Sequence, residues 1–312
     1  MRLGGFPGLL DEVFVGAESY VFHTKTVYTI PVRNTIIGVF DSGFGGLTVL
    51  KALLEVLPDA EYLYFGDTAR LPYGSKSVET VARYACEAAR FLEQQGAELL
   101  VIACNTATAL ALGQIRQAAS VKVLGVIEPG AQRAAAASRS RRVVVIGTEA
   151  TISSHAYREA LAALQIESRE KACPLLVPLV EEGWVEHSVT EQVAKIYLGE
   201  AFSDGFNSAD VLLLGCTHYP LLKPILQRVV PENVTLVDSA ESVALAVLNP
   251  MVSGTSNGGL GQLDGVKTLG VRLSDTSHLR FFVTDSVEKF RRLGTRFLGQ
   301  EIRDITHVDL KE

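Results

Sequence analysis

The segment "AELLVIACNT", residues 97–106, is an apolar run that leads into Cys104 and then into polar side chains. A second segment, "ADVLLLGCTH" at residues 209–218, aligns with it without a gap and places Cys216 opposite Cys104. Leucine and valine match easily by chance, but the chain has only 4 cysteines in 312 residues. The match therefore indicates an internal duplication in which each half places one thiol at the carboxyl end of a buried strand, where parallel sheets bind their ligands.

The rest of the chain has the alternating pattern of an α/β protein. From residue 36 onward, short runs rich in Val, Ile and Leu alternate with longer stretches of helical period, which predicts parallel sheets. We expect strands at 36–40, 62–65, 99–103, 123–126, 143–146, 211–214, 235–237 and 280–283, and helices at 47–57, 77–95, 107–118, 152–164 and 286–298.

This pattern predicts two similar parallel-sheet α/β domains related by pseudo-symmetry, with the active site in the cleft between them. The Ala-rich stretch 128–142 is interpreted as a helix and turn that cross between the domains, or as an ordinary surface helix. Residues 249–265 are rich in Gly, Ser and Asn and are expected to form a mobile loop. The expected division is 1–35 as an N-terminal extension, 36–130 plus 239–312 as a discontinuous first domain, and 131–238 as the second domain.

Composition narrows the classes of function. The net charge of -6 and the lack of a basic stripe argue against nucleic-acid binding and favour a small substrate. Gly, Pro and acids interrupt the opening "MRLGGFPGLLDEVF", and no later run is apolar for the length of a membrane span, so neither a signal peptide nor a membrane helix is expected. The widely spaced cysteines argue against disulfides, and the reduced cytoplasm is the expected location.

Several chemistries compete for Cys104 and Cys216. A lone cysteine is most often an inert buried side chain. A zinc site with His218 is disfavoured because the usual ligand spacings are missing, and a hydrolase that uses Cys216 with His218 as its base leaves the second thiol unexplained. Two thiols facing one carbon suit racemisation, because one removes a proton while the other donates a proton to the opposite face.

Seven motifs follow one another along residues 36 to about 300: "GVFDSGFGGLTVL" (38–50), "YFGDTARLPYGSKS" (64–77), "VIACNTATA" (101–109), "IGTEATISSHAY" (146–157), "CPLLVPLVEEG" (173–183), "LLLGCTHYPLL" (212–222) and "FFVTDSVEKF" (281–290). With these motifs the chain resembles glutamate racemase of the aspartate/glutamate racemase superfamily. The resemblance implies an enzyme that uses no cofactor and supplies D-glutamate for peptidoglycan. Aspartate racemase or a related two-thiol isomerase is the nearest alternative within the superfamily.

The resemblance implies a role for each matching residue. Cys104 would take the α-proton from D-glutamate and Cys216 from L-glutamate, while Asp41 and His218 would assist the two thiols. For Asp41 and His218, a helix cap and an ordinary turn histidine are the alternative interpretations. The resemblance also implies substrate contacts from Asp41, Ser42, Tyr73, Gly74, Ser75, Asn105, Thr106, Thr148, Thr151, Thr217, His218, and either Glu181 or its neighbour Glu182.

The resemblance further implies binding partners. The family often forms homodimers, so a homodimer is expected. Some members with an N-terminal extension depend on a UDP-linked muramyl-alanine activator, so residues 1–33 are a candidate activator site, although a flexible tail is an equal alternative. A silent protein that binds a dicarboxylate or contacts DNA gyrase is the alternative from a different class of function, and the presence of both cysteines argues against it.

Overall fold

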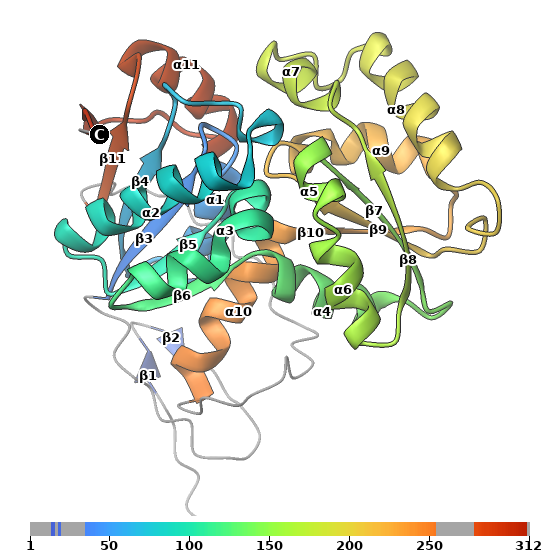
Figure 1. The fold of residues 1–312 in the computed structure, drawn as a ribbon, viewed down its shortest axis with the longest axis horizontal. Coiled ribbons are helices and arrows are strands. Elements are labelled where there is room, and N and C mark those ends of the chain that lie inside the picture. The colour runs from blue at the N-terminus through green and yellow to red at the C-terminus, as the bar shows by residue number, and fades with distance from the viewer. Residues whose placement is uncertain (1–13, 16–17, 20–34, 254–277, 311–312) are drawn as a thin grey trace, which may run out of the picture.

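The computed structural model describes residues 14–15, 18–19, 35–253 and 278–310, which form two parallel sheets lying side by side (Figure 1). We call the six-stranded sheet with its helices the first half and the four-stranded sheet with its helices the second half. The prediction of two parallel-sheet α/β units is confirmed. Most of the expected N-terminal extension, and residues 254–265 of the expected loop, lie outside the described residues.

The first half is built on a sheet whose strands all pair in parallel. The central strand β3 is buried along nearly its whole length, as expected of a parallel strand covered on both faces. It ends at Asp41, and the adjacent strand β5 ends just before Cys104. In sheet order the strands are β12 (Ile305–His307), β11 (Leu279–Val283), β4 (Glu61–Gly66), β3 (Ile36–Asp41), β5 (Leu99–Ile102) and β6 (Lys122–Gly125).

The second half repeats this arrangement with fewer strands, again all parallel. Its strand β9 is buried at every residue and leads directly into Cys216. A separate antiparallel pair joins β1 (Phe14–Val15) and β2 (Glu18–Ser19). In sheet order the strands of the second half are β10 (Thr235–Asp238), β9 (Val211–Gly215), β7 (Arg142–Gly147) and β8 (Glu167–Ala172).

Helices cover both faces of each sheet because alternate strand residues point to opposite faces. In the first half, α2 and α3 pack on one face and α1 and α11 on the other, and in the second half α4 and α6 lie opposite α7, α8 and α9. The helices are α1 (Leu47–Val56), α2 (Val78–Gln94), α3 (Asn105–Ala118), α4 (Ile127–Ala137), α5 (Glu149–Ser153), α6 (Ala156–Ala163), α7 (Leu176–Glu181), α8 (Ser188–Ala201), α9 (Lys223–Val229), α10 (Ser239–Ser253) and α11 (Val287–Leu298), with 3₁₀ turns η1 (Tyr73–Ser75) and η2 (Tyr219–Leu222).

One core is shared between the halves. The face of the first sheet under α1 and α11 and the face of the second sheet under α7 to α9 belong to a single apolar cluster, which α10 also joins. Helix α4 runs from β6 of the first sheet to β7 of the second, so the Ala-rich stretch does form a helix that connects the two sheets.

The structure corrects two expectations about local structure. The helix predicted at 152–164 is two helices, α5 and α6, because His155 has a left-handed φ of 57° that interrupts it. The loop predicted to start at 249 is wrong up to residue 253, because α10 continues to Ser253. The predicted strands are all present, with ends within one residue of those observed.

Candidate active site

Cys104 lies at the start of α3, where its side chain caps the helix. Its sulfur accepts a hydrogen bond from the backbone N–H of Ala107 at 3.4 Å and its thiol donates to Ser42 Oγ at 3.5 Å. Burial, and to a lesser extent the nearby Asp41 carboxylate, raise the pKa of this thiol to about 12, against hydrogen bonds that lower it. Cys104 is therefore a protonated thiol at neutral pH in this structure.

Cys216, a histidine and a glutamate form a chain of polar contacts. The Cys216 sulfur lies 3.9 Å from Nδ1 of His218, and Nε2 of His218 lies 3.1 Å from Oε1 of Glu181, the last residue of α7. Of the two adjacent acids, Glu181 contacts the histidine, whereas Glu182 is exposed. Burial lowers the pKa of His218, but hydrogen bonds with Cys216 and Glu181 outweigh it and raise the pKa to about 10. His218 is therefore an imidazolium at neutral pH.

The raised pKa of His218 predicts a pH-dependent contribution to stability. In the folded protein this pKa is about 10 against a reference value of 6.5, so between these values the folded state binds more protons than the unfolded state. The stabilisation is complete below pH 6.5 and is lost as the pH rises through 10. We expect the difference in free energy of unfolding between wild type and His218→Asn to shrink across this window, by at most about 1.4 kcal/mol per pH unit.

Urea unfolding of both proteins at about pH 6, 8 and 10 measures this difference, in which the contributions of titrating groups remote from His218 cancel. A difference that stays constant over the window would contradict a raised pKa for His218.

Asp41 interacts with the surroundings of both cysteines. Its carboxylate is fully buried, accepts a hydrogen bond from the Gly43 N–H at 2.8 Å and lies 3.5 Å from the hydroxyl of Thr217, the residue after Cys216. Burial raises the pKa of Asp41, while the charge of His218 lowers it. A second bond between the halves runs from the Thr48 hydroxyl to the Thr217 carbonyl at 3.0 Å. The carboxylate beside the first thiol thus also contacts the turn that carries the second.

The turn after β3 approaches the second half so closely that only glycine fits at Gly45. A Cβ atom there would lie 2.2 Å from Thr217 Oγ1 and 2.5 Å from His218 Nδ1, far inside van der Waals contact. Gly45 lies within the motif at 38–50, but its close contact with the other half could be found only in the structure.

Three threonine hydroxyls from both halves form a cluster next to Cys104. Thr106 Oγ1 lies 3.0 Å from Thr148 Oγ1 and 3.2 Å from Thr151 Oγ1, and the latter two are 2.9 Å apart. Thr148 also caps α5 by accepting from the Thr151 N–H, so its hydroxyl stabilises the start of that helix as well. One of the three hydroxyls thus belongs to Thr106, two positions after the thiol, and the other two come from the second half. Each can donate or accept a hydrogen bond.

The side chain of Asn105 is fully engaged within the protein. Its carbonyl oxygen accepts from the Tyr157 hydroxyl at 2.6 Å, and its amide donates to Ser239 Oγ at 3.1 Å. The sequence did not single out Tyr157, the last residue of the motif at 146–157, or Ser239, which lies in none of the motifs. The Asn105 side chain is thus held by one residue of α6 and one of α10.

Tyr73, Gly74 and Ser75 form the 3₁₀ turn η1, and Tyr73 anchors it. The Tyr73 hydroxyl donates to Oδ2 of Asp67 at 2.5 Å, while Thr284 donates to the other carboxylate oxygen at 2.8 Å. Gly74 faces Thr148, because a Cβ atom on it would lie 3.0 Å from Thr148 Cβ, and Ser75 is exposed. The structure thus brings the turn to the threonine cluster, and Asp67 is an anchoring residue that the sequence did not single out.

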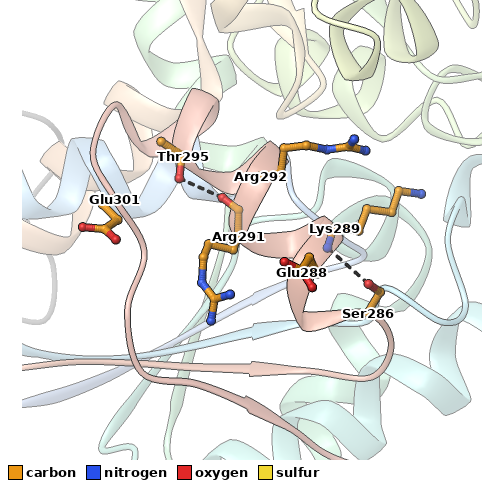
Figure 2. Close-up of a pocket in the computed structure, with 7 residues that line it drawn as sticks. All are labelled: Ser286, Glu288, Lys289, Arg291, Arg292, Thr295 and Glu301. Carbon is orange, nitrogen blue, oxygen red and sulfur yellow. Dashed lines mark hydrogen bonds between the residues drawn. The ribbon is translucent and has the colours of Figure 1, made fainter.

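A surface pocket of about 570 Å³ on α11 lies apart from these residues (Figure 2). None of its lining residues is a predicted site residue. It is lined by Ser286, Glu288, Lys289, Arg291, Arg292, Thr295 and Glu301.

Two features are missing from the described ranges. Within them, no group of three His, Cys, Asp or Glu side chains is arranged to hold a metal ion. Among the same residues, no helix combines the length and apolar character needed to cross a bilayer.

The fold and the site define an α/β protein of two parallel-sheet halves, with a buried cysteine at a matching strand end in each half and an acid–base partner beside it. Residues 37–247 match the sequence profile of the family described as Asp/Glu/Hydantoin racemase. The chain belongs to this family and is an isomerase, an amino-acid racemase, as its motifs predicted.

The chain is similar to glutamate racemases over nearly its whole described length. It is 59% identical over 286 residues to glutamate racemase of Koribacter versatilis, covering 89% of this chain and 98% of that protein. Among solved structures, glutamate racemase of Francisella tularensis in complex with D-glutamate has a TM-score of 0.74 at 36% identity, covering 89% and 98% of the two chains. The Thermus thermophilus glutamate racemase in complex with beta-chloro-D-alanine has a TM-score of 0.73 at 43% identity, covering 88% and 97%.

Proposed function

We propose that the protein is a cofactor-independent glutamate racemase that interconverts L- and D-glutamate by proton transfer between Cys216 and Cys104 and supplies D-glutamate for peptidoglycan. The observation that supports this most strongly is the link between the two thiols: Asp41 influences Cys104 and contacts Thr217 beside Cys216. Two buried thiols at matching strand ends, joined by one carboxylate, suit a reaction that needs an acid and a base on opposite faces of one carbon.

In the direction from L- to D-glutamate, the Cys216 sulfur takes the α-proton and the C–H bond breaks. The Cys104 thiol then gives its proton to the opposite face, and the new C–H bond forms, so no net oxidation occurs. Two observations support this direction: Cys104 holds its proton to a pKa of about 12, and the His218 imidazolium, 3.9 Å from the Cys216 sulfur, can stabilise negative charge on it. The reverse direction exchanges the two protonation states.

An α-proton of an amino acid is a very weak acid, so the site must stabilise the carbanion through preorganised donors. The N-terminus of α3 offers unpaired backbone N–H groups next to Cys104. The hydroxyls of the threonine cluster and of Ser42 lie beside it. We propose that these groups bind the α-carboxylate, while the backbone of η1 and the Thr217 hydroxyl complete the contacts to substrate.

Incubation with L-glutamate in deuterated water tests the reaction. Loss of optical activity should accompany incorporation of deuterium at the α-carbon without any added cofactor. L-aspartate should react at least about tenfold more slowly, because a side chain one methylene shorter costs about 1–3 kcal/mol of binding in a fitted site. No reaction of glutamate, both alone and with UDP-linked muramyl-alanine added, would overturn the proposal, and faster reaction of aspartate would make the protein an aspartate racemase.

The division into domains, the homodimer and the cytoplasmic location also stay proposals. The sheets support a boundary within α4 and another at β10, because α4 joins the sheets and α10 packs on both α1 and α4. Sedimentation of the full chain measures the oligomeric state. The glutamate assay above, repeated with UDP-linked muramyl-alanine, measures dependence on an activator. The candidate binding segment for that activator, residues 1–33, lies almost entirely outside the described residues.

A further inference from the structure

The last helix of the first half, α11, reaches the histidine of the second half. The rings of Phe297 and His218 are perpendicular, at 84°, with their centres 5.2 Å apart. The neighbouring residue Arg296 lies against Gly183, where a Cβ atom would be 2.5 Å from the guanidinium. Gly183 comes two residues after Glu181, the other partner of His218. Figure 1 shows α11 and α7 at the same end of the molecule.

Helix α11 is firmly fixed to the first half. Its Phe290 packs against Phe44 and Tyr64, with ring centres 5.8 Å apart in both pairs. Gly294 fits closely over Leu47, since a Cβ atom on it would lie 2.9 Å from a Leu47 methyl. Phe44 belongs to the same turn as Asp41 and Gly45. The first half, which carries Cys104, thus fixes α11. Helix α11 in turn contacts His218 of the second half, which carries Cys216.

The polar contacts of His218 do not by themselves hold its ring in one orientation, so a further contact is needed. Its two ring nitrogens face Cys216 and Glu181, and Glu181 is a partly exposed residue at the end of a helix of only 6 residues. Perpendicular aromatic pairs contribute about 0.5–1.5 kcal/mol beyond their buried area and favour one ring orientation. Phe297 is 2% exposed, so its ring cannot move away into solvent.

We propose that Phe297 is a positioning residue that holds the imidazole of His218 in line with the Cys216 sulfur, so that the first half orients the acid–base group of the second. This inference rests on the proposed racemase function for its kinetic consequence. Removal of the ring should impair the proton transfer at Cys216 and leave the transfer at Cys104 intact.

Primary isotope effects distinguish the two transfers. We expect Phe297→Leu to lower kcat about tenfold, in line with the loss of one orienting contact. With α-deuterated L-glutamate, whose deuterium goes to Cys216, the isotope effect on kcat/KM should rise, because this step limits the rate more than before. With α-deuterated D-glutamate, whose deuterium goes to Cys104, the isotope effect should fall.

The matched control is Phe91→Leu, the same substitution on α2, where Phe91 packs edge-on against Phe282 on the face of the first sheet opposite α11. It should lower stability to a similar extent and leave the ratio of the two isotope effects at the wild-type value. An unchanged ratio in Phe297→Leu, or an equal change in both variants, would overturn the proposal. If the leucine variant does not fold, Phe297→Met removes the ring while keeping an unbranched apolar side chain.

A measurement without substrate separates this inference from the proposed function. NMR titration of the His218 ring, assigned by comparison with His218→Asn, should show a pKa at least about half a unit lower in Phe297→Leu than in wild type, because looser geometry weakens the hydrogen bonds that raise it. Phe91→Leu should show the wild-type value. A protein that fails to racemise glutamate but shows this shift refutes the function and keeps the positioning role, whereas an unshifted pKa refutes the role.

Discussion

Cys104→Ser and Cys216→Ser are each expected to lower the rate of racemisation by about a thousandfold or more, because a positioned acid or base contributes about 10²–10⁴-fold and the cycle needs both. The change is nearly isosteric, but a serine hydroxyl is a far weaker acid than a thiol. Circular dichroism of glutamate solutions measures the loss from either enantiomer. A variant that retains full activity would remove its residue from the two-base mechanism.

The two variants should differ in the half-reaction that each retains. In deuterated water, Cys104→Ser keeps Cys216 and should exchange the α-proton of L-glutamate without inverting it, whereas Cys216→Ser should exchange the α-proton of D-glutamate. Cys86→Ser is the matched control, since Cys86 is a buried cysteine in the middle of α2 rather than at the end of a strand. Exchange of the opposite enantiomers would reverse the assignment of the two faces, and loss of activity in the control would show a general effect of cysteine replacement.

The positions of the two thiols could be predicted from the sequence because the signal is local. Fully buried parallel strands appear as continuous apolar runs, and both β5 and β9 do so. In contrast, β8 has the sequence "ESREKA" and lies at the edge of its sheet, where only one neighbour pairs with it and its side chains are half-buried. A strand with this composition has no apolar period, so only its pairing with β7 identifies it.

The contacts between the halves could not be predicted, because they depend on the relative placement of distant segments. Thr217 and Asp41 are 176 positions apart, and nothing in either motif indicates their contact. The same holds for Phe297, which the sequence analysis assigned only to a helix, and for Asp67, whose carboxylate holds Tyr73. Motifs specify which residues are present at a site, whereas the packing of the two sheets decides which of them touch.

Gly45→Ala should lower kcat/KM by about a hundredfold or more, because a single methyl group there would overlap two site residues at once. The new Cβ atom would lie 2.2 Å from Thr217 Oγ1 and 2.5 Å from His218 Nδ1, so both side chains must move or the two halves must separate. A displacement of about 1 Å in a catalytic group is sufficient to cost about 10²-fold. Steady-state kinetics with both enantiomers measures the loss.

Gly113→Ala is the matched control for this substitution. Gly113 lies inside α3, and a Cβ atom on it would meet nothing within 4 Å. Alanine is favoured over glycine in a helix by about 1 kcal/mol, so this variant should be slightly more stable than wild type and equally active. If Gly45→Ala keeps wild-type kinetics while remaining folded, the close approach of the β3 turn to His218 is not required for the reaction, and the two halves must work further apart than this structure places them.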